Sequence, residues 1–317
     1  MHNRIYANIH MDALEQNLSS MKANLKEGTQ MIGVIKADAY GHGAVPVAQY
    51  MEPKDYVWGF ATATEEEAVE LRRAGITKPI LILGFTFPEH YEQMAKLGIR
   101  PAVFTLEMAE QMAEAAQRVG ETMHIHLAVD TGMGRIGLYD DARGVKTACA
   151  IAKLKGLQIE GLFTHFARAD ESSIEPAKIQ LDRYLHFAGE LEKAGLAISL
   201  HHVSNSACIM QFSEANLDLV RAGITLYGVS PSDEVREDPV FLHPLMELKS
   251  RVSYIKDVAP GTSISYGGTF VADHPMRVAT IPVGYADGYP RSLSNKGYVL
   301  IHGRRCPILG RICMDQF

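Results

Sequence analysis

The feature that most constrains the fold is a regular alternation of short apolar runs with amphipathic helical patterns, which continues over the first two thirds of the chain. Within each helical pattern the apolar residues are three or four positions apart, so they share one face of a helix. Eight such strand–helix pairs predict a (β/α)8 TIM barrel, in which parallel strands close into a ring covered by helices. The predicted strands are 31–35, 56–61, 79–83, 100–104, 123–129, 157–163, 200–203 and 219–221 with 224–227; the predicted helices are 12–27, 44–51, 64–75, 88–97, 106–119, 141–154, 175–194 and a short one from 206.

An open, doubly wound parallel sheet is the alternative architecture for this alternation. It would need a glycine-rich phosphate turn of the form G-x-G-x-x-G after an early strand. Gly41-His42-Gly43 follows the first predicted strand but matches that form poorly. The sequence therefore favours the closed barrel.

The last third of the chain has a different pattern. After Pro231-Ser232-Asp233 the helical spacing stops, and short apolar segments broken by Pro and Gly indicate strands. A chain of 317 residues is also long for one ordinary core and suits a barrel with a smaller second domain. We predict the barrel at 10–235 and a mostly β domain at 236–317. Its expected strands lie at 246–258, 263–266, 276–282, 298–301 and 308–312.

Charge and composition exclude several classes of protein. Lys and Arg number 31 against 37 Asp and Glu, so the formal charge is −6, whereas nucleic-acid binding needs a basic face. No apolar run approaches the roughly 20 residues of a membrane span, and the N-terminus lacks the apolar core of a signal peptide. The cysteines are scattered, without the spacing of metal ligands. We expect a cytoplasmic protein with no disulfide and no metal site, its cysteines being Cys149, Cys208, Cys306 and Cys313.

A lysine at the end of the first predicted strand is the first candidate for chemistry. Lys36 follows the apolar run 31–35 and precedes a loop rich in Gly, Asp and His. Desolvation lowers the pKa of a lysine, and a neutral amine attacks a carbonyl to form a Schiff base. The alternative is a strand-end lysine whose ammonium reaches water.

Polar residues also follow the other predicted strands. In a TIM barrel the loops at the carboxyl ends of the strands hold the active site. Each residue alone has an ordinary explanation, such as a core histidine or a helix cap, but their position at matching strand ends indicates one shared site. They are Tyr40 after the first strand, 130–135 after the fifth, His165 after the sixth, 204–206 after the seventh and Arg221 on the eighth.

The last two strand ends predict a phosphate site. Ser206 at a helix start can donate its hydroxyl, and Gly223 lets the backbone N–H of Ile224 approach an anion. A lysine on one side and a phosphate site on the other suit pyridoxal 5'-phosphate, which needs a Schiff base and an anion anchor.

The segment 34–43, Val-Ile-Lys-Ala-Asp-Ala-Tyr-Gly-His-Gly, closely resembles the cofactor-lysine motif of the alanine racemases, pyridoxal-phosphate enzymes that interconvert L- and D-alanine. In that family a barrel is followed by a mostly β domain, the first residues join the β domain, and two subunits form a head-to-tail homodimer. The resemblance therefore places residues 1–9 in the second domain, with a strand at 4–9. Further matching motifs lie at 130–137, 164–166, 204–207, 220–228, 265–268, 284–289 and 310–316.

The resemblance implies a two-base mechanism. Lys36 carries the cofactor and acts as base on one face of the substrate Cα, and Tyr266 of the partner subunit acts on the other. Racemisation needs proton removal on one side and return on the opposite side, which two opposed bases provide. Arg135 corresponds to the residue that contacts the cofactor phenolic oxygen and the substrate carboxylate.

The resemblance also assigns Arg221 to the pyridine nitrogen. An arginine stays protonated and leaves the ring largely neutral, which disfavours transamination. His165 resembles the histidine that supports the cofactor and its arginine, while Tyr40, Ser206, Gly223 and Ile224 match phosphate contacts. Met314 and Tyr285 correspond to substrate-pocket residues, the latter in the substrate funnel with Asp170, Arg291 and Arg311.

Two departures from the family pattern matter. Many members have a lysine, often carbamylated, seven residues before the arginine of this motif; here that position is Ala128, so Arg135 needs another counter-anion. The chain also ends at Phe317, where members continue for several more strands, so the sequence is expected to be C-terminally truncated. We expect the activity to survive the first departure with altered positioning of Arg135.

The expected function is alanine racemisation that supplies D-alanine for peptidoglycan. A serine or broad-specificity racemase of the same family is the nearest alternative, because a pocket discriminates weakly against one added hydroxyl. A non-catalytic pyridoxal-phosphate-binding barrel would have no use for Tyr266. A decarboxylase would show a longer glycine-rich phosphate loop and a cysteine-based C-terminal motif, and neither is found.

Overall fold

The computed structural model describes residues 4–235 and 238–317. The chain divides into two compact units, His10–Leu245 and Met1–Ile9 with Met246–Phe317. Within the described residues no helix is long and apolar enough to cross a bilayer.

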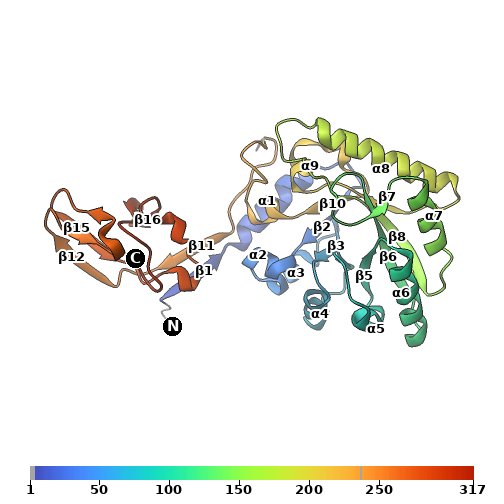
Figure 1. The fold of residues 1–317 in the computed structure, drawn as a ribbon, viewed down its shortest axis with the longest axis horizontal. Helices are drawn as coiled ribbons and strands as arrows, with labels where there is room; N and C mark the ends of the chain where they lie inside the picture. The colour runs from blue at the N-terminus through green and yellow to red at the C-terminus, as the bar shows by residue number, and fades with distance from the viewer. Residues whose placement is uncertain (1–3, 236–237) are drawn as a thin grey trace. The chain divides into compact units, whose positions relative to one another are not determined.

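The first unit is a nearly closed barrel of eight parallel strands, which confirms the predicted fold class (Figure 1). The ladder is continuous from β10 through β2 to β9, and the backbone N–H of Arg221 on β10 donates to the Ser204 carbonyl just after β9, over 3.1 Å. In ring order the strands are β10 (Leu219–Ala222), β2 (Gln30–Val34), β3 (Val57–Thr62), β4 (Ile80–Ile82), β5 (Ile99–Val103), β6 (Met123–Asp130), β8 (Leu157–Phe163) and β9 (Leu200–His202); the short β7 (Leu138–Tyr139) pairs with β6.

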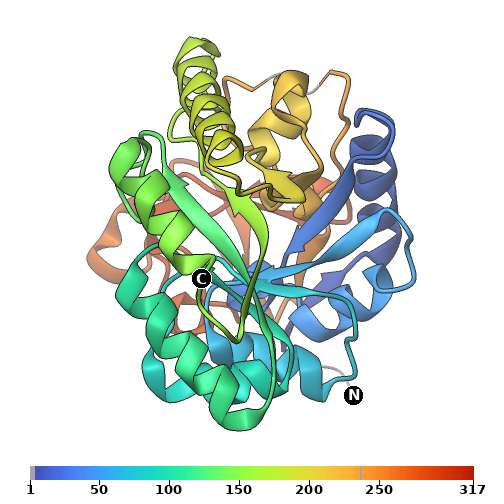
Figure 2. The same cartoon turned by 90° about the vertical axis from the view of Figure 1, so that its right-hand side faces the viewer.

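Helices cover the outside of these strands (Figure 2). Their starts follow from capping residues: the Thr64 side chain forms a capping box with Glu67, and the Thr105 hydroxyl accepts from the Met108 N–H over 3.1 Å. The helices are α1 (Met11–Ala23), α3 (Ala44–Met51), α4 (Glu65–Arg73), α5 (Tyr91–Lys96) after η1 (Pro88–His90), α6 (Leu106–Val119), α7 (Ala142–Ile151), α8 (Glu175–Lys193) and α9 (Ser206–Gln211) followed by η2 (Ser213–Ala215).

The second half of the eighth predicted strand is wrong. Residues Ile224–Tyr227 form a 3-10 helix, η3, which ends at Gly228 with φ 76°. A Cβ at Gly228 would overlap the His243 carbonyl, so the chain turns away from the barrel at this glycine. The N–H groups of Thr225 and Leu226 in η3 donate to Ser206 Oγ and to the Gly223 carbonyl, so Ile224 at the start of η3 is the residue whose N–H could serve a ligand.

The first unit extends past the boundary predicted near residue 235. Asn17 on α1 is fully buried, and its side-chain amide donates to the carbonyls of Leu226 and His243, over 3.1 and 2.9 Å. The His243 N–H donates back to Asn17 over 2.7 Å. These bonds hold the connecting segment against the barrel as far as Leu245.

The second unit is built of antiparallel pairs. In the described part of the chain, β1 (Ile5–Ile9) pairs with β11 (Met246–Ser250) and β12 (Tyr254–Val258) with β15 (Met276–Thr280). The strand predicted at 308–312 is wrong, because His302 and Gly303 both adopt positive φ and make a two-residue hairpin. The hairpin joins β16 (Tyr298–Ile301) to β17 (Arg304–Pro307), and a further short pair is β13 (Ser263–Ile264) with β14 (Phe270–Val271).

Candidate active site

A cavity of about 690 Å³ opens at the carboxyl ends of the barrel strands. Its polar lining comes from the segments that follow β2, β6, β8 and β9 and from β10 with the start of η3. All barrel residues that the sequence assigned to the cofactor line it, together with Asp170 and Ala128: Lys36, Tyr40, Arg135, His165, Ser206, Arg221, Gly223 and Ile224.

A left-handed turn presents Lys36 and Tyr40. Lys36 lies two residues beyond the end of β2 and begins α2 (Lys36–Gly41), in which Ala37 to Tyr40 have φ between 51° and 55°. Four such non-glycine residues in a row are disfavoured by roughly 1–2 kcal/mol each. The Glu67 carboxylate accepts from the Ala37 N–H over 2.7 Å and Asp38 accepts from Ala44 over 2.7 Å. Strain of this kind is typical of a functional site.

The aromatic ring of Tyr227 packs against this turn. Its centroid lies 4.8 Å from that of Tyr40 and 4.5 Å from that of His42. Its hydroxyl donates to the Val34 carbonyl over 2.9 Å, and burial keeps the Tyr227 pKa far above its ordinary value, so this group stays a donor.

Ser206 forms the base of an anion site. Its Oγ accepts from the Gly223 N–H and from the Thr225 hydroxyl, each over 3.0 Å. With both lone pairs occupied, the Ser206 hydroxyl hydrogen remains to be donated elsewhere. A Cβ at Gly223 would lie 3.4 Å from Tyr40 Oη and 3.5 Å from Ser206 Oγ, so these hydroxyls converge on the space above the glycine.

Arg221 lies at the floor of the cavity and is 3% exposed. Its guanidinium donates to the Thr164 carbonyl over 2.8 Å and to Nδ1 of His165 over 3.1 Å. Burial and the nearby positive charges lower the pKa of His165 to about 3. The imidazole is therefore neutral, and because Nδ1 accepts from Arg221, its proton is on Nε2.

The loop that carries Arg135 is held by side chains on both sides. Asp130 accepts from the N–H groups of Gly132 and Gly134 over 2.9 and 3.0 Å. The buried amide of Gln180 on α8 donates to Thr131 and to the His165 carbonyl, each over 3.2 Å. Arg135 itself is exposed and, among the described residues, has no carboxylate partner.

The other predicted site residues belong to the second unit, where they gather around residues 311–314. The hydroxyl of Ser265, which has φ 63°, donates to the Arg311 carbonyl over 2.6 Å and so fixes the turn before Tyr266. The N–H of Tyr285 donates to the Cys313 carbonyl over 3.1 Å, next to Met314. Tyr266, Met314 and Tyr285 are 70%, 55% and 45% exposed.

Sequence reasoning missed several residues that shape the cavity. The Gln180 side chain holds two of the loops that line the cavity. His202 accepts a hydrogen bond from Arg221 on the side away from the cavity. Both residues are buried. A polar residue on the apolar face of the helix at 175–194 was the available signal for Gln180. For His202 the signal was a histidine at the end of a short barrel strand.

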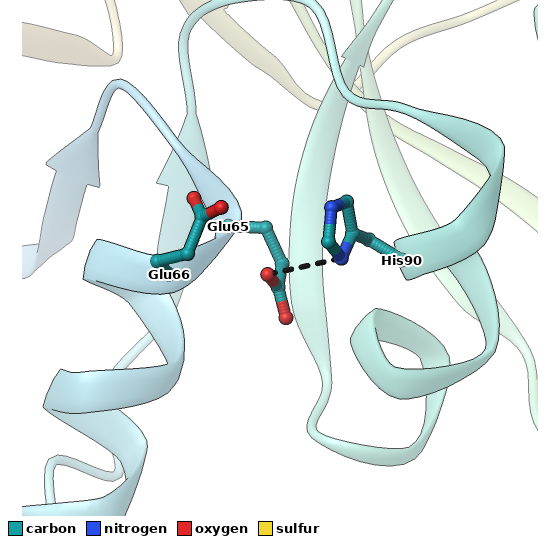
Figure 3. A group of neighbouring side chains, drawn as sticks. All are labelled: Glu65, Glu66 and His90. Atoms are coloured by element: carbon teal, nitrogen blue, oxygen red, sulfur yellow. Dashed lines mark ion pairs between the residues drawn. The ribbon is translucent and has the colours of Figure 1, made fainter.

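A group of potential metal ligands in the described residues lies elsewhere. Glu65 and Glu66 begin α4, and Nδ1 of His90 lies 3.2 Å from Glu65 Oε2 (Figure 3). The positive end of the helix dipole favours carboxylates here and opposes a cation. None of the three lines the cavity, and we interpret the group as a carboxylate–imidazole contact at the start of α4.

Both parts of the chain are similar to known proteins. The family model described as alanine racemase, N-terminal domain, matches residues 9–231, and the model for the alanine racemase C-terminal domain matches 245–317. A protein named alanine racemase from Desulforamulus reducens is 43% identical over 98% of this chain and 84% of its own length. The structure of alanine racemase from Clostridium difficile 630 has a TM-score of 0.95 at 44% identity, over 99% of this chain and 82% of that one. A second structure of that protein, in complex with cycloserine, has a TM-score of 0.93 at 42% identity, over 100% and 82%.

Proposed function

Because the chain belongs to the alanine racemase family, we propose that it interconverts L- and D-alanine with pyridoxal 5'-phosphate as its cofactor. The observation that carries this proposal is the cavity itself, which unites an amine, a buried arginine and an anion site. The D-alanine formed is a building block of peptidoglycan. The relatives give no support to a serine or broad-specificity enzyme as the main activity.

The residues of the cavity fit this cofactor. The Lys36 amine would hold its aldehyde carbon, and Ser206 with Tyr40 and the N–H of Ile224 would hold its phosphate. Pyridoxal phosphate supplies an electron sink that acidifies the Cα–H of a bound amino acid. Arg221 would face the ring nitrogen, and His165 would keep Arg221 in place. An anionic group requires an open space with hydrogen-bond donors around it. The space above Gly223, to which two hydroxyls point, meets this requirement.

Two bases on opposite faces would exchange the proton. Lys36 takes or returns it on one face of Cα, and Tyr266 does so on the other. Arg135, which has no carboxylate partner in the described residues, is available to the substrate carboxylate. Met314 and Tyr285 would border the substrate methyl group and leave little room for a larger side chain.

We propose that Tyr266, Tyr285 and Met314 act in the cavity of a second copy of the chain, in a homodimer. The support is their exposure, between 45% and 70%, on a unit that orders all three around residues 311–314. Exposed large apolar and tyrosine side chains grouped in this way are typical of protein interfaces.

The test uses the full chain loaded with pyridoxal phosphate and L-alanine or L-serine as substrate. Chiral chromatography should detect D-alanine at a higher rate than D-serine. Lys36→Ala should abolish both, whereas Lys153→Ala, a change at an exposed lysine, should not. A loaded enzyme that forms no D-alanine would exclude alanine racemisation. Faster formation of D-serine would identify L-serine as the preferred substrate.

A further inference from the structure

Arg221 is a buried cation without a direct counter-charge. Its five hydrogen bonds go to the carbonyls of Thr164, His202 and Val203 and to ring nitrogens of His165 and His202. Within residues 4–235 and 238–317 no carboxylate lies at ion-pair distance from it. A buried charge is strongly destabilising unless it is compensated. The three carbonyl dipoles compensate part of this charge, and what lies behind the two imidazole acceptors decides how strongly they bind the guanidinium.

A chain of buried side chains leads from Arg221 into the barrel interior. Nη1 of Arg221 lies 3.1 Å from Nδ1 of His202, whose Nε2 lies 2.8 Å from Nδ1 of His126. Nε2 of His126 lies 3.1 Å from a carboxylate oxygen of Glu160. Both histidines are fully buried, and neither lines the cavity. The four residues come from β10, β9, β6 and β8, which are consecutive in the ring of strands, so the path runs along one side of the barrel interior.

The hydrogen bonds along this path all run in one direction, each residue donating to the next. Hydrogen bonds from His126 and Arg100 lower the pKa of Glu160 to about 2 despite its burial, so Glu160 is ionised and only accepts. His126 must then carry its proton on Nε2. Burial lowers the pKa of both histidines and keeps them neutral, so Nδ1 of His126 accepts from His202 and Nδ1 of His202 accepts from Arg221.

The surrounding residues leave room for these rings and hold them. A Cβ at Gly161 would overlap the His126 imidazole, so only glycine at this position of β8 admits the ring. The Phe163 ring stacks on His202 with centroids 5.0 Å apart and 9° between planes. At the far end, Arg100 donates to Glu160 over 2.7 Å, and His124 Nδ1 lies 3.8 Å from the same carboxylate. The path is therefore a packed part of the core.

We propose that Glu160, His126 and His202 form a one-way hydrogen-bond relay that gives Arg221 a remote counter-charge and fixes the direction of its guanidinium toward the cavity. Each neutral imidazole is polarised by the carboxylate behind it, so its accepting nitrogen binds the guanidinium more strongly. Glu160 and His126 are positioning residues, because they act through His202 and touch no ligand. The consequence for catalysis rests on the proposed racemase function, whereas the relay itself does not.

The Glu65–His90 pair provides a matched control. It is also a carboxylate–imidazole contact, 3.2 Å long, with a buried glutamate that is 6% exposed (Figure 3). Neither residue lines the cavity, and neither is hydrogen-bonded to a residue of the relay in the described part of the chain. A Glu65→Gln change therefore removes an equivalent charge without touching the relay.

The first experiment reads the imidazole tautomers directly. The full chain, without added cofactor, is labelled with ¹⁵N-histidine, and signals are assigned with His126→Asn and His202→Asn. In the wild type both rings should show a protonated Nε2 and an unprotonated Nδ1. Glu160→Gln should shift the nitrogen signals of His202, two hydrogen bonds away, and Glu65→Gln should not. A His202 ring that is charged or protonated on Nδ1 excludes the relay, as does a wild-type spectrum without a histidine–histidine nitrogen–nitrogen hydrogen bond, a result that needs no variant.

The second experiment uses the loaded enzyme. Glu160→Gln should lower kcat by roughly 10-fold or more, as outer carboxylates behind ligating histidines do, with little change in the KM for L-alanine. In an Arg221→Gln background the same change should have almost no effect, because the relay acts through that residue. If Glu160→Gln still lowers kcat in the Arg221→Gln background, the proposal is wrong. An inactive wild type would refute the racemase function instead, and the nitrogen signals would still decide the relay.

Discussion

The hydroxyl of Tyr227 donates to the carbonyl of Val34 over 2.9 Å, at the point where β2 ends and the left-handed turn toward Lys36 begins. The same ring packs against Tyr40 and His42. One residue of η3 therefore supports both the amine side and the anion side of the cavity. We therefore expect the affinity for pyridoxal phosphate to depend on Tyr227, a residue that does not line the cavity.

Tyr227→Phe should leave the Val34 carbonyl buried without a donor and lower the free energy of unfolding by about 1–3 kcal/mol. It should also weaken cofactor binding, because the turn that carries Lys36 and Tyr40 loses its support. Tyr91→Phe is the matched control, since Tyr91 is equally buried and donates to the Thr86 carbonyl over 3.0 Å, away from the cavity. Urea unfolding and pyridoxal-phosphate titration separate the two effects. Equal affinities in both variants would contradict the supporting role.

Gly223→Ala should fold normally and lose the cofactor. The added Cβ would meet Tyr40 Oη at 3.4 Å and Ser206 Oγ at 3.5 Å, which is ordinary contact, but it would fill the space that an anion needs. We expect the Kd for pyridoxal phosphate to rise by about 10-fold or more, equivalent to the loss of one good hydrogen bond to a charged group. Gly189→Ala, at an open position of α8, should leave the Kd unchanged. An unaltered Kd in Gly223→Ala would move the anion site elsewhere.

The buried histidines make stability fall at mildly acidic pH. The pKa of His165 is lowered to about 3, and burial also lowers those of His126 and His202. Below about pH 6.5 the unfolded chain binds protons on these rings that the folded chain does not, so the free energy of unfolding falls by up to about 1.4 kcal/mol per pH unit for each histidine. For His165 this loss continues down to its folded pKa. His165→Asn should reduce the slope measured by urea unfolding between about pH 7 and pH 5, and His186→Asn, at an exposed site, should not. If the free energy of unfolding begins to fall only at the lower pH at which carboxylates titrate, this account is wrong.

Ala128→Lys should make the activity depend on bicarbonate. Ala128 is 2% exposed among Ala102 and Phe163, where a charged lysine would be costly, while Arg135 has no carboxylate partner in the described residues. Carbamylation would turn the new side chain into an anion near Arg135 and should change the KM for L-alanine several-fold. Ala128→Met, of similar length, should show no bicarbonate dependence. An activity identical to wild type at every bicarbonate concentration would count against the role of this position.

The sequence predicted the barrel because its strands and helices have different periods and because polar residues recur where strands end. Lys36, Arg135, His165 and Ser206 follow four apolar runs, and the topology brings such positions to one rim whatever the details of each loop. Single-position signals were sufficient for these residues. The same reasoning suggested a Schiff-base amine for Lys36 and a phosphate contact for Ser206, whereas the roles of Arg135 and His165 came from the family resemblance.

Features that depend on contacts across the barrel were not predictable in this way. His126 and His202 lie 76 residues apart in sequence, and their hydrogen bond exists only because the ring of strands brings β6 and β9 together. The left-handed turn at Ala37 to Tyr40 was missed because these residues ordinarily avoid positive φ, and tertiary contacts from Glu67 and Tyr227 hold it. The strand expected at 308–312 failed for a local reason, an unrecognised His302–Gly303 turn.

A shared active site predicts that two inactive variants restore each other. Lys36→Ala removes the amine of the cavity and Tyr266→Phe removes the hydroxyl on the second unit, so each homodimer should be inactive. In a symmetric dimer whose sites combine one Lys36 with the Tyr266 of the other copy, a mixed dimer has one intact site and one doubly defective site.

Co-expression of the two variants should therefore give about a quarter of wild-type activity, because half of randomly paired dimers carry one working site of two. If the two variants are expressed separately and mixed without subunit exchange, the mixture should have no activity. If Lys36 and Tyr266 acted within one chain, every site in the mixed dimer would lack one base, and co-expression would recover nothing. Activity equal to the sum of the two single variants would thus exclude a site shared between subunits, while the racemase function would still be decided by the wild-type enzyme.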